Sequence, residues 1–140
     1  MMMWKDRYAI GVERIDEQHK ELFDRLGSFI QVTNQKGDWS DRLEKAKETM
    51  NFLGDYVNYH FADEEELCRE LGFPEQEEHK KAHQEFKKGI ETYVLKASEN
   101  SFDEATMQEF AGKLMTWLIV HVGKEDQKIG EYVKREGGGA

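Results

Sequence analysis

Residues 43–71, LEKAKETMNFLGDYVNYHFADEEELCREL, decide the fold. One series of residues recurs along this segment at alternating steps of three and four: Leu43, Ala46, Met50, Leu53, Val57, His60, Glu64, Leu67 and Leu71. Such steps place one face of a long helix against its neighbours, as in an antiparallel bundle. A histidine and a glutamate occupy consecutive positions on that face. Burying this pair is costly unless something, such as a bound metal ion, compensates.

Three further segments carry the same helical period. Their inward residues would be His19, Leu22, Phe23, Leu26, Phe29, Ile30 and Thr33 in the first helix, His79, Ala82, His83, Phe86, Ile90, Tyr93 and Ala97 in the third, and Met107, Phe110, Leu114, Trp117, Leu118 and His121 in the fourth. The chain has one proline and short connections between these segments. We therefore predict an all-α fold, an antiparallel up-down-up-down four-helix bundle with an extended N-terminal arm.

Capping and stop signals set the expected ends of the helices. Asp16 is the expected N-cap of the first helix and Gly37 its stop, while Ser101 with Glu104 forms a capping-box pattern for the fourth helix. Residues 1–15 have no helical period and form the predicted arm. The expected helices cover residues 17–36, 41–71, 75–98 and 101–134.

Length and composition favour one domain, which we place at residues 1–136, followed by a disordered glycine-rich tail at 137–140. The net charge of −9 argues against nucleic-acid and anionic-membrane partners, which need a basic face. No apolar run is long enough to span a bilayer, and the start lacks the apolar stretch of a signal peptide. Cys68 is the only cysteine, so we expect a reducing cytoplasm and an inert buried thiol, with a redox role as the alternative.

All five histidines of the chain fall into one pattern of potential metal ligands. The pattern is a lone His19, then His60-x-x-x-Glu64, His79-x-x-x-His83 and His121-x-x-x-x-Asp126. Imidazole is the commonest protein ligand for transition metals, and carboxylates can bridge two ions. Five nitrogens with two carboxylates are too many ligands for one ion, so the pattern predicts a dinuclear centre.

The spacing within each pair tests this interpretation. Residues four apart project from one helix face, so His60 with Glu64, and His79 with His83, can each bind together. His121 and Asp126 are five apart and turn away from each other on a regular α-helix. If both are ligands, the helix must widen locally into a π turn, near Gly123. Glu125 is the alternative ligand, since it needs no such distortion.

The motifs resemble those of the hemerythrin family, specifically single-domain bacterial hemerythrins. The resemblance extends from the arm to about residue 133 and rests on Ile15-Asp16-x-x-His19, His60-Phe61-x-x-Glu64-Glu65, Phe73-Pro74, His79-x-x-x-His83 and Trp117-Leu118-x-x-His121-x-x-x-x-Asp126. It favours Asp126 over Glu125. It implies two non-heme iron ions joined by an oxo or hydroxo bridge, with these metal ligands: His79, His83 and His121 at one iron, His19 and His60 at the other, and Glu64 and Asp126 between them.

Counting ligands under this resemblance leaves one open position, on the iron with two histidines. The resemblance implies that O2 binds there. The expected lining of this position is Leu22, Phe23, Phe61, Trp117 and Ile119, all of them core residues in the first instance. We interpret the acidic run 63–66, apart from Glu64, as a solvated face, with a supporting role at the metal site as the alternative for Glu65.

The resulting hypothesis is a non-enzymatic O2-binding protein for transport, storage or scavenging. One alternative is an O2- or redox-sensing module that acts on a signalling partner. Others are a di-iron peroxidase or nitric-oxide-handling enzyme, an iron-centre repair protein, and a metal-storage or zinc protein. The histidine-rich ligand set favours carrying O2 over activating it, because oxidising di-iron bundles use four carboxylates and two Glu-x-x-His motifs. We expect a monomer or weak homo-oligomer, with a redox or signalling protein as the possible partner.

Overall fold

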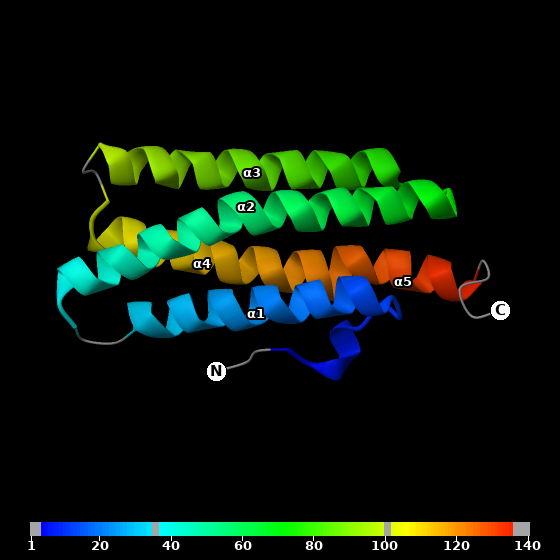
Figure 1. Ribbon diagram of the computed structural model, residues 1–140, viewed down its shortest axis with the longest axis horizontal. Coiled ribbons are helices and arrows are strands. Elements are labelled where there is room, and N and C mark those ends of the chain that lie inside the picture. The colour runs from blue at the N-terminus through cyan, green and yellow to red at the C-terminus, as the bar shows by residue number, and fades with distance from the viewer. Residues whose placement is uncertain (1–3, 35–36, 100–101, 136–140) are drawn as a thin grey trace.

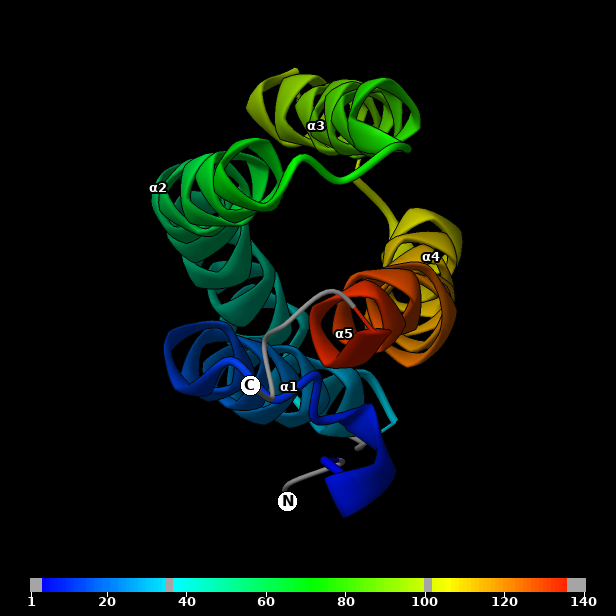
Figure 2. The same cartoon turned by 90° about the vertical axis from the view of Figure 1, so that its right-hand side faces the viewer.

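The computed structural model describes residues 4–34, 37–99 and 102–135 and confirms an all-α antiparallel four-helix bundle (Figure 1). Its elements are the 3-10 turn η1 (Asp6–Tyr8), α1 (Glu13–Thr33), α2 (Trp39–Leu71), α3 (Gln76–Ser98), α4 (Glu104–Val120), the π-helical turn η2 (His121–Glu125) and α5 (Asp126–Arg135). The elements α4, η2 and α5 follow one another without a break and form the fourth rod of the bundle. Seen end-on, the four rods surround one shared interior, in which α1 packs against α2 and α4, and α2 against α3 (Figure 2).

The interior contains most of the residues predicted for it. Every inward residue expected in α1 is buried, and so is the α2 series from Ala46 to Leu67. In α3 the expectation is partly wrong, since Ala82 is exposed and Phe86 and Ile90 are only half-buried. The reason is that α3 packs mainly on α2 and leaves a groove of about 270 Å³ toward α4. The side chains of Phe86 and Ile90 line this groove.

The first helix begins earlier than the capping prediction placed it. Val12 is the N-cap of α1, and Asp16 lies inside the helix, so the prediction of Asp16 as N-cap is wrong. The Asp16 carboxylate instead accepts hydrogen bonds from the backbone N–H groups of Ile10 and Gly11, at 2.8 and 3.2 Å. It therefore fastens the arm to α1. The arm is also shorter than residues 1–15, contains the turn η1, and is described only from Trp4 onward.

The first helix also ends before the predicted stop. α1 ends at Thr33, while residues 35–36 of the expected helix lie outside the described residues. The Thr33 carbonyl accepts hydrogen bonds from Arg42 of α2 and Gln108 of α4, both at 3.0 Å. Because side chains satisfy this terminal carbonyl, the helix can stop without a glycine.

The starts of α2 and α4 differ from prediction for a common reason. An aspartate caps each of these helices. Asp38 caps α2, which begins at Trp39, two residues before the predicted start, and Asp103 caps α4 in place of the expected Ser101. Their carboxylates accept hydrogen bonds from the backbone of Ser40 and Thr106. Ser101 lies outside the described residues, as does the predicted tail 137–140.

The remaining helix ends lie within one residue of the predicted positions. The helix α2 ends at the predicted residue, where Gly72 adopts a left-handed conformation with φ of 65°. α3 begins one residue later than expected, and α5 ends one residue later. No helix among the residues that the structure describes is long and apolar enough to cross a membrane.

Candidate metal centre

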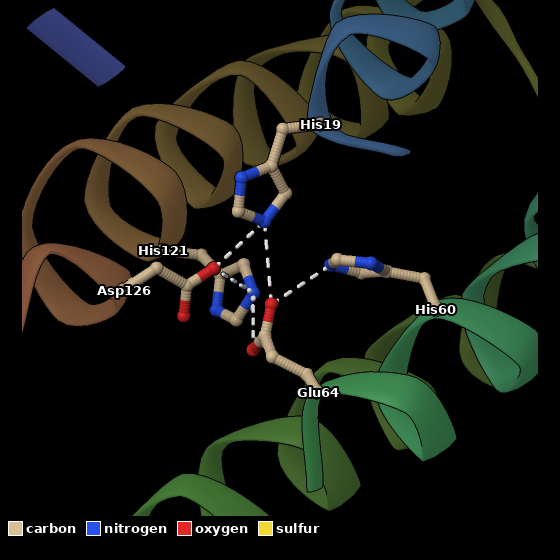
Figure 3. Close-up of side chains that lie close together, drawn as sticks. All are labelled: His19, His60, Glu64, His121 and Asp126. Carbon is tan, nitrogen blue, oxygen red and sulfur yellow. Dashed lines mark hydrogen bonds and ion pairs between the residues drawn. The ribbon is translucent and has the colours of Figure 1, made fainter. Parts of the chain in front are cut away.

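All seven predicted metal ligands converge inside the bundle, and Figure 3 shows five of them, His19, His60, Glu64, His121 and Asp126. The seven come from every rod: His19 from α1, His60 and Glu64 from α2, His79 and His83 from α3, His121 from η2 and Asp126 from α5. None of these residues is more than 5% exposed. A cluster of five histidines and two carboxylates is thus enclosed where the four rods meet.

The Glu64 carboxylate separates the histidines into two groups. Its Oε2 atom faces His19 and His60, with their Nε2 atoms at 3.2 and 3.0 Å. Its Oε1 atom faces the Nε2 atoms of the other three histidines, at 3.1 Å for His83, 3.3 Å for His121 and 3.4 Å for His79. Glu64 therefore lies between a group of two imidazoles and a group of three.

Asp126 also contacts both groups. Its Oδ1 atom lies 2.8 Å from His79 Nε2. Its Oδ2 atom lies 2.9 Å from His19 Nε2 and 3.0 Å from His121 Nε2. The two carboxylates thus face each other across the cluster, each with oxygens directed at both histidine groups, as Figure 3 shows for five of the seven residues.

The π turn η2 explains how Asp126 reaches this position. On a regular α-helix, five residues would turn Asp126 about 140° away from His121. In η2 the Asp126 N–H instead donates to the His121 carbonyl, five residues back, and this wider turn brings the Asp126 side chain inward. Glu125, which the spacing alone favoured, has a side chain that is 38% exposed and lies 3.4 Å from Lys128 Nζ. The structure places Asp126, rather than Glu125, among the histidines.

The donor spacing fits metal coordination. Imidazole and carboxylate ligands bind transition metals at ~2.1 Å, so neighbouring ligands on an octahedral ion lie about 3.0 Å apart. The N···O separations in the cluster run from 2.8 to 3.4 Å. His60 Nε2, His121 Nε2 and Asp126 Oδ2 are buried and make no hydrogen bond to the described residues, although each lies near an opposite charge. His60, His121 and Asp126 each offer a ligand atom within 4.8 Å of the others, so bound metal could satisfy these unpartnered atoms.

Electrostatics also indicates a need for positive charge in the cluster. Burial alone would lower the pKa of His19, His79 and His121, but the neighbouring Asp126 and Glu64 outweigh burial and raise these pKa values to about 9, 9 and 10. Burial opposes ionisation of the two carboxyl groups as well, yet the histidines hold the pKa of both below the usual range. Metal cations would supply the same compensation and displace these protons.

A chain of hydrogen bonds fixes the orientation of His60. The Gln18 side chain, 5% exposed, donates from Nε2 to the Asp63 carboxylate at 2.7 Å, and its Oε1 lies 2.7 Å from His60 Nδ1. Because a carboxylate only accepts, Asp63 fixes the amide orientation of Gln18. Gln18 Oε1 must then accept from His60 Nδ1–H, which leaves Nε2 free for a metal.

His83 is oriented in the same way from the other side of the cluster. Its Nδ1 atom lies 2.7 Å from Glu65 Oε2, so the carboxylate accepts the Nδ1–H and His83 Nε2 faces Glu64. The sequence offered this contact only as the alternative for Glu65. Gln18 was not identified from the sequence. This polar residue lies three positions after buried Ile15 and four before buried Leu22, and that spacing could have placed it on the inward face of the helix.

The five residues predicted to line the oxygen-binding position differ in burial and in their distance from the histidines. Leu22, Phe23 and Phe61 are fully buried. Phe61 stacks on His83 at a centroid distance of 3.8 Å and lies 5.8 Å from His60, so it borders both histidine groups. The ring of Phe23 stacks on Tyr8 of the arm at 5.0 Å.

Trp117 and Ile119 do not lie where the sequence placed them. Trp117 stacks on His121 at 4.7 Å and on Phe86 at 3.9 Å, on the side of the three histidines rather than the two. Ile119 is 44% exposed and lies with Arg7 and Tyr8 along a surface groove. It faces outward because it follows Leu118, whose side chain fills the core position at that level of α4.

Comparison with known proteins gives consistent matches. The family model for the hemerythrin HHE cation binding domain matches residues 10–133. A bacteriohemerythrin from Stenotrophomonas maltophilia is 31% identical over 138 residues, which cover 96% of this chain and 82% of that protein. Bacteriohemerythrins from Campylobacter jejuni and Clostridium acetobutylicum are 30% and 26% identical, each over 91% of this chain, and the matches cover 92% and 98% of those proteins.

Proposed function

The chain belongs to the hemerythrin family, and we propose that it binds dioxygen reversibly at two non-heme iron ions held by the seven buried side chains. The observation that carries this proposal is the position of Glu64, whose two oxygens face separate histidine groups. A carboxylate shared in this way is suited to bridge two ions rather than to chelate one.

The ligand assignment follows from these two groups. Under this proposal His79, His83 and His121 would hold one ion, His19 and His60 would hold the other, and Glu64 and Asp126 would be shared by both. The iron pair, when bound, would supply two electrons that can be transferred to dioxygen and returned when it is released. Because two histidines rather than three would hold the ion at His19 and His60, that ion would be the one to bind the gas.

The protein's own contribution is enclosure. His19 and His60 are 0% exposed. Phe61 directly follows His60, with ring centroids 5.8 Å apart, and buried Leu22 lies about one helical turn after His19 on α1. An apolar surrounding of this kind withholds water and protons from a bound gas molecule, which favours its release unchanged. This enclosure of His19 and His60 supports the proposal that dioxygen is carried rather than converted.

Reversible oxygenation is the direct test. The iron-loaded protein is reduced without air, its visible spectrum is recorded, air is admitted, and oxygen is then removed under argon. We expect an absorption band that appears with oxygen and disappears without it over repeated cycles. A single irreversible oxidation would contradict carriage and favour an O2 or redox sensor. Sustained consumption of peroxide or nitric oxide would favour an enzyme.

Ion content tests the ligand set independently of oxygen. Asp126→Asn and Glu125→Gln change adjacent carboxylates, of which only the first faces the histidines. We expect two ions per chain in the unmodified protein and in Glu125→Gln, and at most one in Asp126→Asn, by elemental analysis. The reverse pattern would overturn the assignment of Asp126.

A further inference from the structure

The π turn that carries Asp126 takes away the α-helical partner of one carbonyl. In an α-helix the Val122 carbonyl would accept from the N–H of Asp126, four residues on. In η2 that N–H donates to the His121 carbonyl instead. A widened turn of this kind is costlier than an α-helical one and persists where the surroundings stabilise it.

The side chain of Gln127 provides that stabilisation. Its Nε2 atom donates to the Val122 carbonyl at 3.1 Å and also to the Tyr8 carbonyl at 2.9 Å. Both hydrogens of this side-chain amide are therefore donated to backbone carbonyls. The first bond closes the π turn from within the same rod, and the second ties the turn to the N-terminal arm.

The arm itself is firmly seated at this point, so it can serve as an anchor. Tyr8 is 6% exposed, and its ring stacks on Phe23 of α1 with an interplanar angle of 9°. Gly123 lies under that ring, where a Cβ atom would come within 3.1 Å of it. A glycine in the π turn thus lets Tyr8 approach closely enough for its carbonyl to meet Gln127.

We propose that Gln127 is a positioning residue for Asp126: by joining the π turn to the arm, it holds the Asp126 carboxylate between the two histidine groups. This inference rests on the proposed metal centre, since Asp126 is its predicted bridge. Without the amide of Gln127, the turn would relax toward α-helical geometry and move the carboxylate away from His19 and His79.

The test compares two glutamines with similar bonds at different places. Gln127→Met removes the donors beside the metal centre, and Gln108→Met removes an equivalent amide, which donates to the Thr33 carbonyl at 3.0 Å in another part of the bundle. Metal-free protein is titrated with cobalt(II), and the visible spectrum reports affinity and coordination geometry. We expect Gln127→Met to bind cobalt 10- to 100-fold more weakly, a range typical of residues that orient ligands, with an altered spectrum. Gln108→Met should bind as the unmodified protein does.

A second pair separates hydrogen bonding from charge. Gln127→Lys keeps donors at a similar reach, while Gln127→Glu offers only acceptors to the two carbonyls. We expect the lysine variant to bind cobalt more tightly than the glutamate variant. Simple electrostatics predicts the opposite order, because an added carboxylate attracts cations and an added ammonium repels them.

The outcomes separate this inference from the proposed function. Unchanged cobalt binding in Gln127→Met, equal weakening in Gln108→Met, or tighter binding in Gln127→Glu than in Gln127→Lys would each overturn the role of Gln127. If the unmodified protein binds two cobalt ions but its iron form does not take up oxygen reversibly, the oxygen proposal fails while the role of Gln127 stands.

Discussion

Replacing Gln18 should weaken one metal position and spare the other. Gln18→Met keeps the size of the side chain but removes the oxygen that lies 2.7 Å from His60 Nδ1. The buried His60 N–H then has no acceptor, and leaving such a group unsatisfied costs about 1–3 kcal/mol. His60 also becomes free to adopt the other tautomer, in which Nε2 carries the hydrogen and cannot bind a metal.

The magnitude follows from this loss. Residues that orient a metal-binding histidine typically contribute 10- to 100-fold in affinity, or about 1.4–2.7 kcal/mol, which agrees with the cost of the unsatisfied N–H. Because Gln18 contacts His60 and none of His79, His83 or His121 in the hydrogen bonds observed, only the ion of the two-histidine group should be affected. A stepwise cobalt(II) titration resolves the two dissociation constants.

Gln18→Glu is the matched control. Its carboxylate still accepts from His60 Nδ1–H, but it loses the donor to Asp63 and brings a like charge up to that carboxylate. We expect this variant to bind both ions at least as tightly as the unmodified protein. The reasoning is refuted if Gln18→Met leaves both constants within twofold of the original, or if it weakens both positions equally.

Two further predictions concern the rest of the bundle. Cys68, 1% exposed and with a pKa raised by burial to about 12, should react with a thiol reagent at pH 8 only after denaturant is added; rapid labelling of the folded chain would contradict this. Gly112→Ala, in open space on α4, should raise the free energy of unfolding by about 1 kcal/mol, as alanine does over glycine in a helix. The free energy of unfolding of Gly130→Ala, measured in urea, should be about 1–3 kcal/mol lower than that of Gly112→Ala, because its Cβ would meet the Ile10 backbone at 3.1 Å. Equal stabilisation of both variants would show that the Ile10 backbone shifts to admit the methyl group.

The fold could be predicted because its signals are periodic and local. The three-and-four spacing in residues 43–71 fixes both the helix and the face that it buries, and His60 and Glu64 stand on that face without any distortion. Helix starts were less predictable, since neighbouring residues compete to cap them. Asp38 caps α2 two residues before the predicted start, and Val12 caps α1 ahead of Asp16, whose carboxylate accepts hydrogen bonds from the arm.

The spacing of residues along the sequence could not predict contacts between distant segments. Gln18 of α1 is hydrogen-bonded to His60 of α2, and Gln127 is hydrogen-bonded to Tyr8 of the arm. Each bond joins residues far apart in the chain, so neither produces a periodic pattern in the sequence. The choice between Glu125 and Asp126 also depended on the π turn. Local geometry favoured Glu125, and the resemblance of the motifs favoured Asp126, which is the side chain that the structure places among the histidines.

The two supporting residues at the cluster differ in charge, and this difference bears on oxygen binding. His83, in the three-histidine group, donates to the Glu65 carboxylate, whereas His60, in the two-histidine group, donates to the neutral amide of Gln18. A carboxylate partner makes an imidazole a stronger donor to its metal, so the amide would leave the ion that we propose to bind oxygen less electron-rich. That ion should therefore give up its electron less readily. We expect Gln18→Glu to bind metal normally but to autoxidise faster than the unmodified protein. Stopped-flow decay of the oxygenated form measures this rate, and a slower decay would contradict this account.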